Sequence, residues 1–286
     1  MEVELIYTLT TLIYGSIAID SVQSICSLIS SGTELKIFRG TFDSSEPLDV
    51  NIKGMSDQAM AYPLSYGYSL VGKIIRTGSP QNEHLIGKHV FTFSPHSSRL
   101  RCDLDSVHIV PDGIPPEDAI FLPSVETALS IIHDAHVRMG ERVAVFGQGL
   151  IGLLVTSILS LNKYEMKTDS ANMLFGTVTA FDTISDRLAA ASVLGASEAL
   201  LPQSARHAGP FDVSIEVSGN GRALQSAIDC TRDHGRIIIG SWYGDSDVPL
   251  KLGMDFHRSH KKLITTQVSD IPPALRGLWS KGKCGR

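Results

Sequence analysis

The spacing of apolar residues differs between the two halves of the chain. Up to about residue 120, short apolar runs are separated by clusters of Gly, Pro, Asn and Asp, and three of these runs are typical of strands: 69–75, 88–93 and 107–110. From Ser124 to His136, apolar residues recur every three or four positions, which predicts a helix. We therefore expect a β-rich first domain over residues 1–123.

Short apolar strands alternate with helical stretches in the second half. The predicted strands are 142–146, 178–181, 212–217, 236–239 and 263–268, and the predicted helices are 150–161, 184–194 and 222–231. Strands that are apolar throughout and separated by helices predict a parallel sheet covered on both faces. We expect an α/β fold, with this domain over residues 124–270, a surface insertion at 162–176 and a short tail at 271–286.

The most apolar run, residues 5–19, predicts two short strands around Gly15. Three threonines, Gly15 and Ser16 interrupt the run, whereas a membrane-spanning helix needs about 20 apolar residues. A secretory signal begins with basic residues, and this run is preceded by Glu2 and Glu4 instead. We expect a cytoplasmic protein without a membrane partner. An organelle remains the alternative if a targeting piece precedes these residues.

Composition narrows the class of protein. The chain has 286 residues, of which 43% are hydrophobic and 19% charged, and this excludes global disorder. It carries 25 Lys and Arg against 30 Asp and Glu, and the net charge of −5 disfavours nucleic-acid binding. Four widely spaced cysteines without a C-x-x-C pair exclude a cysteine-cluster zinc site. A small molecule is the expected partner.

A G-x-G-x-x-G motif lies between a predicted strand and a predicted helix. It consists of Gly147, Gln148, Gly149, Leu150, Ile151 and Gly152. The first glycine permits a tight turn, the second lets a diphosphate approach the backbone, and the third lets helix and strand pack closely. The helix N-terminus offers unpaired N–H groups to the phosphates. The motif predicts a dinucleotide site, although a glycine turn in another α/β protein and S-adenosylmethionine as ligand remain alternatives.

An acidic residue is expected to hold the adenosine ribose of the dinucleotide. Asp182 follows the strand 178–181 directly and lies 30 residues after Gly152, a long gap that the insertion explains. Its carboxylate would repel a 2′-phosphate, which favours NAD over NADP, although Arg187 weakens that preference. The other predicted cofactor-binding residues follow later strands at the same sheet edge, near the adenosine or the nicotinamide: Ser218, Gly240 and Ser241.

These residues lie in segments that resemble the medium-chain dehydrogenase/reductase superfamily of the zinc alcohol dehydrogenase type. The resemblance covers roughly residues 22–270 and looks closest to the branch containing bacteriochlorophyllide a dehydrogenase. It is carried by SGTELKIFRG (31–40), YPLSYGYSLVGKI (62–74), VRMGERVAVFGQGLIG (137–152), DRLAAASVLGAS (186–197), FDVSIEVSGN (211–220) and GRIIIGSW (235–242).

The resemblance implies a chaperonin-10-like catalytic domain at 1–123, a Rossmann domain at 124–270 and an active site in the cleft between them. It implies hydride transfer between a nicotinamide and an alcohol, carbonyl or activated alkene. It also implies that residues 271–286 are a shortened return to the catalytic domain, and that two copies pair as a homodimer.

The zinc ligands of the family are replaced in this chain. The family's Cys-Gly-[Ser/Thr]-Asp motif aligns with residues 31–34, so Ser31 stands in place of the cysteine ligand. The histidine of its Gly-His-Glu motif has become Tyr68, and near the third ligand only Glu126 can coordinate. A hydroxyl and a phenol are poor zinc ligands at neutral pH. We therefore predict no catalytic zinc.

Two ways of keeping a metal remain open at this point. One is a metal held by Glu126 and a histidine. The other is an unrelated site formed by the histidines of the first domain, for which solvent-exposed loop positions are the simpler interpretation: His84, His89, His96 and His108.

Without a metal, the substrate oxygen must be polarised by hydrogen-bond donors and general acids. The resemblance places Thr33 at the hydroxyl that relays the alcohol proton, Lys36 at the end of that relay and Tyr68 at the histidine ligand. His96 and Glu126 lie in segments expected near the cleft. Each has a structural alternative: a turn cap for Thr33, a solvated side chain for Lys36, a packing aromatic for Tyr68 and a helix N-terminus for Glu126.

The predicted function is an NAD(P)-dependent oxidoreductase that acts on an alcohol or carbonyl without catalytic zinc. The alternative is a non-catalytic nucleotide-binding or scaffold protein derived from an alcohol dehydrogenase, because the zinc ligands are replaced.

Overall fold

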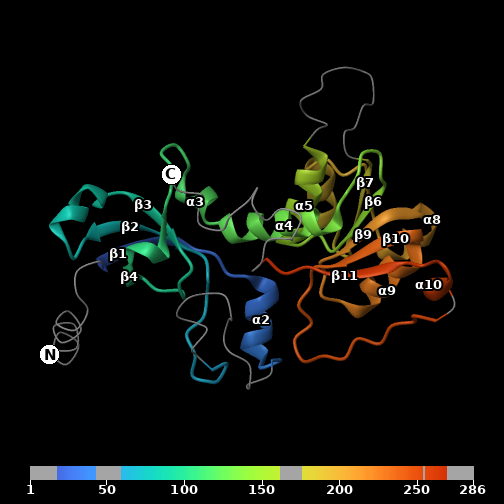
Figure 1. Ribbon diagram of the computed structural model, residues 1–286, viewed down its shortest axis with the longest axis horizontal. Coiled ribbons are helices and arrows are strands. Elements are labelled where there is room, and N and C mark those ends of the chain that lie inside the picture. Colours follow the sequence, from blue (N-terminus) through green and yellow to red (C-terminus); the bar gives the residue numbers. More distant parts are fainter. Residues whose placement is uncertain (1–17, 43–58, 162–175, 254, 269–286) are drawn as a thin grey trace, which may run out of the picture. The chain divides into compact units, whose positions relative to one another are not determined.

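The computed structural model describes residues 18–42, 59–161, 176–253 and 255–268 (Figure 1). The described residues divide after Pro123 into two compact units. The first contains an antiparallel sheet and the second a parallel one. The expected fold class, a chaperonin-10-like β-rich domain followed by a Rossmann domain, is confirmed.

The first unit is built on a curled five-stranded antiparallel sheet. In sheet order its strands are β4 (Arg99–Asp103), β1 (Ala18–Ser27), β2 (Leu70–Arg76), β3 (His89–Thr92) and β5 (Val107–Ile109). Three of them correspond to the predicted runs, and β1 and β4 complete the sheet. The two strands predicted around Gly15 lie outside the described residues, apart from the start of β1.

Both faces of this sheet are buried. Val71 and Ile74 of β2 belong to different hydrophobic clusters, and so do the adjacent Val90 and Phe91 of β3. Because side chains alternate across a strand, neighbouring apolar residues fill opposite faces. This explains why these strands are apolar in consecutive positions rather than in alternate ones.

The first unit also contains helices that the apolar pattern did not predict. The longest is α2 (Ser31–Arg39), which ends where Gly40 adopts a left-handed backbone (φ 69°) and donates its N–H to Ile37 O. Gly40 is a typical helix stop signal, and it was the only local cue to this helix. The shorter helices are α3 (Pro116–Ala119) and the 3-10 turns η1 (Pro80–Leu85) and η2 (Leu104–Ser106).

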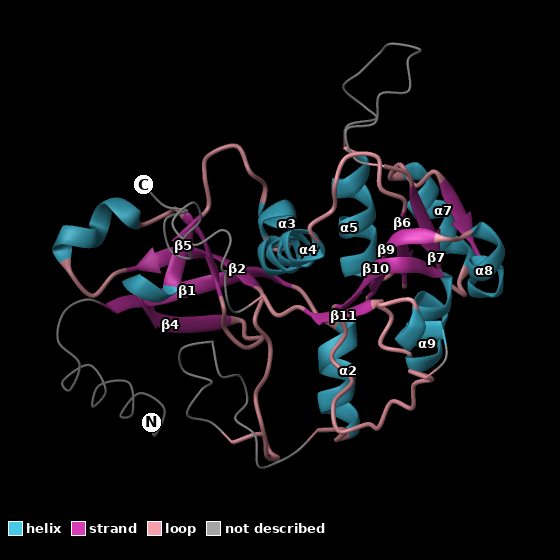
Figure 2. Cartoon of the chain, turned by 45° about the vertical axis from the view of Figure 1, so that its right-hand side comes forward, coloured by secondary structure: helices cyan, strands magenta, loops and turns pink. Residues whose placement is uncertain are grey.

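The second unit contains a six-stranded parallel sheet with doubly wound order (Figure 2). In sheet order its strands are β11 (Lys262–Thr265), β10 (Thr231–Ile239), β9 (Phe211–Glu216), β6 (Val143–Phe146), β7 (Val178–Phe181) and β8 (Glu198–Leu200). The order reverses beside β6, the strand of this sheet that comes first in the chain, so β7 and β9 flank it. Ligands of such sheets bind at the carboxyl ends of the strands near this reversal.

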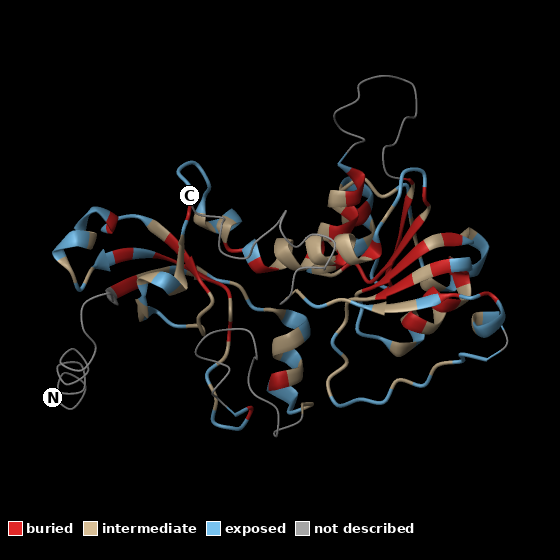
Figure 3. Ribbon diagram, viewed as in Figure 1, coloured by how far each residue is buried: buried red, intermediate tan, exposed pale blue. Residues whose placement is uncertain are grey.

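Helices pack on both faces of the parallel sheet. They are α4 (Leu122–Ala135), α5 (Leu150–Ser160), α7 (Ser185–Val193), α8 (Ala205–Ala208), α9 (Gly221–Cys230) and α10 (Asp255–Arg258), with the 3-10 turn η3 (Pro202–Ser204). Helices α4 and α5 bury Ile131 and Val155 against Val145 of β6. On the other face, α9 buries Leu224 against Phe146 of the same strand. The buried stripes of the strands are visible in Figure 3.

Several predicted boundaries were wrong. The helix predicted at 222–231 ends at Cys230, and the last of its residues, Thr231, begins β10 instead. Polar residues 232–234 and a register shift between Thr231 and Arg236 interrupt the strand, so only its apolar second half was recognised. The three-residue strand β8 was too short to predict. The insertion at 162–176 lies outside the described residues, except for Gly176.

Candidate functional site

The turn after β6 depends on Gly147. This residue has a positive φ of 95°, and its N–H donates to Phe181 O of the neighbouring strand β7 over 2.8 Å. A Cβ at this position would lie 2.7 Å from the backbone of Ser218, which follows β9. Any larger residue would therefore push apart the loops that follow β6 and β9.

The other two glycines of the motif differ in their surroundings. A Cβ on Gly152 would lie 1.8 Å from the Gly147 carbonyl oxygen, so helix α5 packs directly on the turn. A Cβ on Gly149 would meet no atom within 4 Å, so open space lies beside the residue that precedes α5. The first N–H groups of a helix lack intrahelical partners. Open space and N–H groups together fit a diphosphate.

The side chains between the glycines do not all face this space. Gln148 is fully buried, where its amide donates to Val145 O over 3.1 Å and accepts from the Thr156 hydroxyl over 3.1 Å. Ile151 packs against the apolar core, whereas Leu150 is 36% exposed. Gln148 and Ile151 can therefore offer a ligand only their backbone.

Asp182 lies against the glycine turn. Its Oδ2 accepts from the Gln148 N–H over 2.6 Å, and its Oδ1 accepts from the Ile184 N–H over 2.9 Å. The side chain is 6% exposed, and Arg187 Nη1 lies 3.7 Å from Oδ2. A carboxylate has about four acceptor positions, so Asp182 can hold its two backbone donors and still accept from hydroxyl groups.

Glu216, at the end of β9, is a site residue that the sequence analysis missed. It is fully buried, and its Oε1 accepts from the Ser218 N–H, the Ser218 hydroxyl and the Gly219 N–H over 2.7, 2.6 and 3.1 Å. Its Oε2 accepts from the Tyr243 hydroxyl over 2.6 Å. Burial and this hydrogen bond raise the pKa of Tyr243. The sequence offered one sign of its role: Glu216 is a charged residue at the end of an otherwise apolar strand.

The loops after β9 and β10 are tied to each other. The Gly219 N–H donates to Ser241 Oγ over 2.8 Å, and the Gly240 N–H donates to Glu216 O over 2.9 Å. Ser218 in turn contacts the turn at Gly147. The structure therefore brings most of the predicted cofactor-binding residues to one edge of the sheet, around the end of β6.

His96 contacts two segments that carry other candidates of the first unit, helix α2 and residues 66–68. Its Nε2 lies 2.9 Å from Glu34 Oε2 on α2, and its backbone N–H donates to Tyr66 O over 3.3 Å. A Cβ on Gly67 would lie 2.9 Å from the His96 ring, so these segments are in close contact. The ring of Tyr68 meets that of Tyr66 edge to face at 6.1 Å. The Glu34 partner was not predicted.

The remaining catalytic candidates lie on helices. Thr33 and Lys36 are half-buried on α2, and the Lys36 carbonyl accepts from the Thr41 N–H over 3.0 Å at the end of that helix. Glu126 is half-buried on α4, in the second unit. The catalytic roles of these three residues stay predictions.

The donor set does not fit the zinc that the family implies. Ser31 is exposed at the start of α2, and Tyr68 supplies a phenol, so two of the aligned positions offer weak ligands. Across the described residues, no group of three or more His, Cys, Asp or Glu side chains is placed to hold a metal. The four histidines considered above therefore do not form such a group. That the chain lacks zinc stays a prediction.

Known proteins that are similar to this chain include dehydrogenases. A family model described as zinc-binding dehydrogenase matches residues 169–280, within the unit that carries the glycine turn. The chain is therefore similar to zinc-binding dehydrogenases, and this match supports the resemblance to the medium-chain dehydrogenase/reductase superfamily. The narrower placement beside bacteriochlorophyllide a dehydrogenase stays a prediction.

One curated relative is D-guloside 3-dehydrogenase of Escherichia coli K12. It is 26% identical over 227 residues, which are 75% of this chain and 62% of the relative. The chain therefore spans less than two thirds of that relative's length.

Solved structures of dehydrogenases share the fold. A Sinorhizobium meliloti 1021 protein described as a zinc-binding dehydrogenase, bound to NADP, superimposes with a TM-score of 0.67 at 15% identity. The match covers 88% of this chain and 78% of that one. A short chain alcohol dehydrogenase of E. coli CFT073 in complex with NADH gives 0.61 at 15% identity, over 87% and 74% of the two chains.

No helix within the described ranges is both long and apolar enough to cross a lipid bilayer. The apolar run at 5–19 lies almost entirely outside those ranges.

Proposed function

We propose that this protein is an NAD(P)-dependent oxidoreductase that transfers a hydride between the nicotinamide and an alcohol or carbonyl group of a small molecule. One observation carries the proposal: open space beside Gly149, at the start of α5, lies next to a turn that Asp182 holds through the Gln148 N–H. This arrangement offers N–H groups to a diphosphate and a carboxylate to a ribose. The dehydrogenase relative supports the reaction class.

The cofactor is proposed to be NAD rather than NADP. Asp182 is buried beside the turn, and a second negative charge from a 2′-phosphate would be repelled by its carboxylate. Arg187 lies 3.7 Å from the same carboxylate and offsets part of that repulsion. The preference is therefore a matter of degree, and titrations with NADH and NADPH under identical conditions measure it.

The residues of this chain would bind and orient the cofactor. The N-terminus of α5 would hold the diphosphate, Asp182 the adenosine ribose, and the loops carrying Ser218, Gly240 and Ser241 the rest of the dinucleotide. When bound, the nicotinamide supplies the hydride chemistry. Because the zinc ligand positions do not fit the metal, side chains must polarise the substrate, and the candidates are Thr33, Lys36, Tyr68, His96 and Glu126.

The experiment that tests the proposal is titration with NADH, followed by fluorescence and calorimetry. Gly149→Ala adds a methyl group where the diphosphate would approach, yet meets no protein atom, so it should weaken NADH binding about tenfold or more without loss of folding. Gly253→Ala is the matched control, because its Cβ also meets no atom within 4 Å. A folded wild-type protein that binds neither NADH nor NADPH would refute the proposal.

A non-catalytic nucleotide-binding or scaffold protein is the second candidate, favoured by Ser31 and Tyr68 in place of metal ligands. The two proposals differ in turnover. The first predicts a change of NADH absorbance with a panel of vicinal diols, sugar alcohols and glycosides or the corresponding carbonyl compounds. Binding without turnover over the whole panel favours the second, and stoichiometric zinc in the purified protein would contradict the metal-free mechanism.

The cellular setting is also a proposal. We infer a cytoplasmic homodimer, because the family resemblance implies a cytosolic enzyme that pairs as two copies. The net charge of −5 disfavours binding to nucleic acid or to an anionic membrane. Light scattering after gel filtration measures the number of copies.

A further inference from the structure

Four strand ends line up at one edge of the parallel sheet in the second unit. Phe146 of β6 is paired with Phe181 of β7 on one side and with Glu216 of β9 on the other. Glu216 is paired in turn with Ile239 of β10. Neighbouring strands lie about 4.8 Å apart, so the ends of β7 and β10 are separated by about 14 Å. Asp182, directly after β7, therefore cannot hold a ligand group that lies over β10.

A dinucleotide bound at the glycine turn would extend along this edge in both directions. In the proposed function, Asp182 takes the adenosine ribose beyond β7, and the diphosphate lies at the N-terminus of α5, after β6. The nicotinamide half is then left to the loops that follow β9 and β10. The first of these loops starts beside the turn, because a Cβ on Gly147 would lie 2.7 Å from the Ser218 backbone.

The loop after β9 is exposed but is held by a buried anchor. Ser218 and Gly219 are exposed, whereas Glu216 is fully buried. One carboxylate oxygen, Oε1, accepts from the N–H groups of both loop residues and from the Ser218 hydroxyl. Exposed residues have little packing of their own, so the position of this loop depends on where the Glu216 carboxylate lies.

Tyr243 holds the other oxygen of that carboxylate. Its hydroxyl donates to Glu216 Oε2 over 2.6 Å, and its ring packs against the apolar cluster that contains Phe146. Within the described residues, the carboxylate accepts all four of its hydrogen bonds, as an ionised carboxylate must. Because Tyr243 follows β10, this bond ties the two loops at a second point, in addition to the bond between Gly219 and Ser241.

We propose that Tyr243 is a positioning residue for the nicotinamide half of the dinucleotide, because its hydrogen bond to Glu216 holds the loops after β9 and β10 in place for that half. This inference rests on the proposed function and divides the cofactor site into two parts. Asp182 and the glycine turn bind the adenosine and the diphosphate, with or without the Tyr243 hydroxyl. That hydroxyl contributes only to ligands that carry the second ribose and the nicotinamide.

The binding test compares NADH with ADP, which lacks the second ribose and the nicotinamide, by calorimetric titration of the whole chain. Tyr243→Phe keeps the ring but removes the O–H donor, so NADH affinity should fall about tenfold and ADP affinity should change less than about twofold. The matched control is Tyr62→Phe, which removes a phenol that donates to Ile37 O in the first unit and should change neither affinity. Gly149→Ala should weaken both ligands, because both carry the diphosphate.

Two substitutions of Glu216 separate its position from its charge. Glu216→Gln keeps an acceptor oxygen for Ser218 and Gly219 and can donate an N–H to the Tyr243 oxygen, so NADH affinity should stay within about threefold of the wild type. Glu216→Ala removes both ties and should weaken NADH binding about tenfold or more. Circular dichroism establishes folding, and Tyr243→Phe decides where Glu216→Ala does not fold. An equal loss in Glu216→Gln and Glu216→Ala would overturn the inference, because the charge would then matter rather than the position.

A second measurement needs no cofactor. Hydrogen exchange followed by mass spectrometry reports on the N–H groups of Ser218 and Gly219. We expect these groups to exchange about tenfold faster in Tyr243→Phe than in the wild type, while β6 and β7 exchange at wild-type rates. Wild-type exchange of the loop in Tyr243→Phe would overturn the inference, because the phenol would then not hold the loop.

The outcomes separate this inference from the proposed function. A folded wild-type protein that binds neither NADH nor NADPH overturns the proposed function, and this inference with it. Equal NADH affinity of the wild type and Tyr243→Phe overturns the inference alone and leaves the cofactor site standing. A loss in Tyr243→Phe that is equally large for NADH and ADP does the same, because the hydroxyl would then support the whole site rather than the nicotinamide half.

Discussion

The three glycines of the turn after β6 have different consequences for substitution. Gly147 has a backbone conformation that favours glycine. At Gly152 a side chain would collide with the Gly147 carbonyl oxygen, whereas at Gly149 a side chain would enter open space. Substitution of the first two should affect folding, and substitution of the third should affect the ligand.

Gly152→Ala is therefore expected to destabilise the protein. The new Cβ would lie 1.8 Å from Gly147 O, and a backbone atom cannot move aside without displacing α5 or the turn. We expect the free energy of unfolding to fall by about 3 kcal/mol, at the upper end of the cost of overpacking. Urea denaturation followed by circular dichroism measures this, with Gly149→Ala as control. An unchanged midpoint in Gly152→Ala would contradict the packing described.

Asp182 and Glu216 are two similar site residues, of which the sequence predicted only one. Both are buried carboxylates at the ends of parallel strands, but only Asp182 was predicted, because it follows the expected strand after the glycine motif. The role of Glu216 depends on donors from Ser218, Gly219 and Tyr243, up to 27 positions away. A contact between residues so far apart in the sequence cannot be predicted from their spacing.

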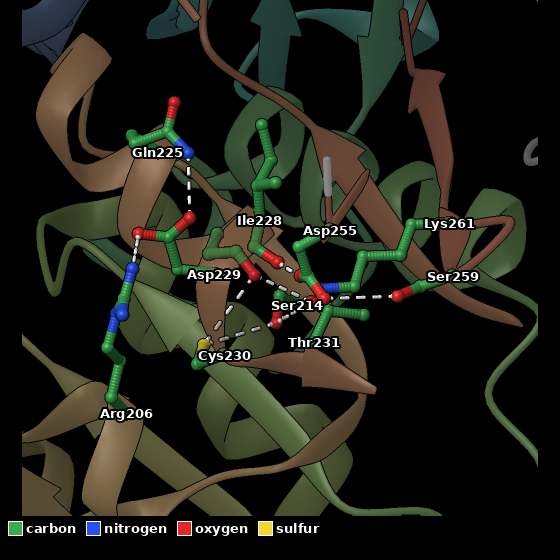
Figure 4. Close-up of polar contacts among 11 residues, drawn as sticks. Arg206, Ser214, Gln225, Ile228, Asp229, Cys230, Thr231, Asp255, Ser259 and Lys261 are labelled. Atoms are coloured by element: carbon green, nitrogen blue, oxygen red, sulfur yellow. Dashed lines mark hydrogen bonds and ion pairs between the residues drawn. The ribbon is translucent and has the colours of Figure 1, made fainter. Parts of the chain in front are cut away.

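At the scale of elements, the end of α9 is tied to the segment before β11 by Lys261. Its side chain is 2% exposed, and Nζ donates to Ile228 O over 3.0 Å and to Asp255 Oδ2 over 2.5 Å, as Figure 4 shows. The last carbonyl groups of a helix have no intrahelical donor, so a buried ammonium group there supplies one and complements the helix dipole.

Lys261→Met should lower the free energy of unfolding by about 1–3 kcal/mol, because the buried Ile228 carbonyl loses its donor. The matched control is Lys262→Met, whose side chain is exposed on the adjacent position and should change stability by less than about 0.5 kcal/mol. Thermal denaturation of both variants gives the comparison. Equal stability of the two variants would show that the buried ammonium group does not stabilise α9.

Helix α2 is the clearest element that the apolar pattern failed to predict. Its residues Leu35 and Phe38 are 44% and 84% exposed, so the helix lacks the single buried stripe on which periodicity depends. Only Ile37 is buried among its apolar side chains. Gly40 was a local cue to the end of this helix. The contact between Glu34 and His96 had no local cue, because the two residues are 62 positions apart.

At the scale of the whole molecule, acid stability depends on carboxylates that are paired in the folded state. Burial disfavours the charged form of Asp212, but the Arg142 N–H, 2.7 Å from Oδ2, and the Arg232 guanidinium outweigh burial and hold its pKa below the usual 3.8. A lowered pKa in the folded state stabilises the protein above pH 3.8, and this stabilisation is lost as the pH falls through the folded-state value.

Asp212→Asn should therefore lower the free energy of unfolding at pH 7, and the difference from the wild type should shrink below pH 3.8. Asp112→Asn, with a side chain that is 90% exposed, is the control and should show little difference at either pH. Urea denaturation between pH 7 and 3 measures both. A difference that stays constant over this range would contradict the pairing of Asp212.

The sequence by itself determined the α/β class, the order of the main strands and helices, the glycine turn and the acidic residue beside it. These depend on period, spacing and backbone freedom, which are properties of neighbouring residues. Only the tertiary structure decided that Glu34 meets His96, that Glu216 ties two loops together and that Lys261 reaches α9. Such contacts form where distant segments pack, and their geometry comes from the sheets and helices that bring those segments together.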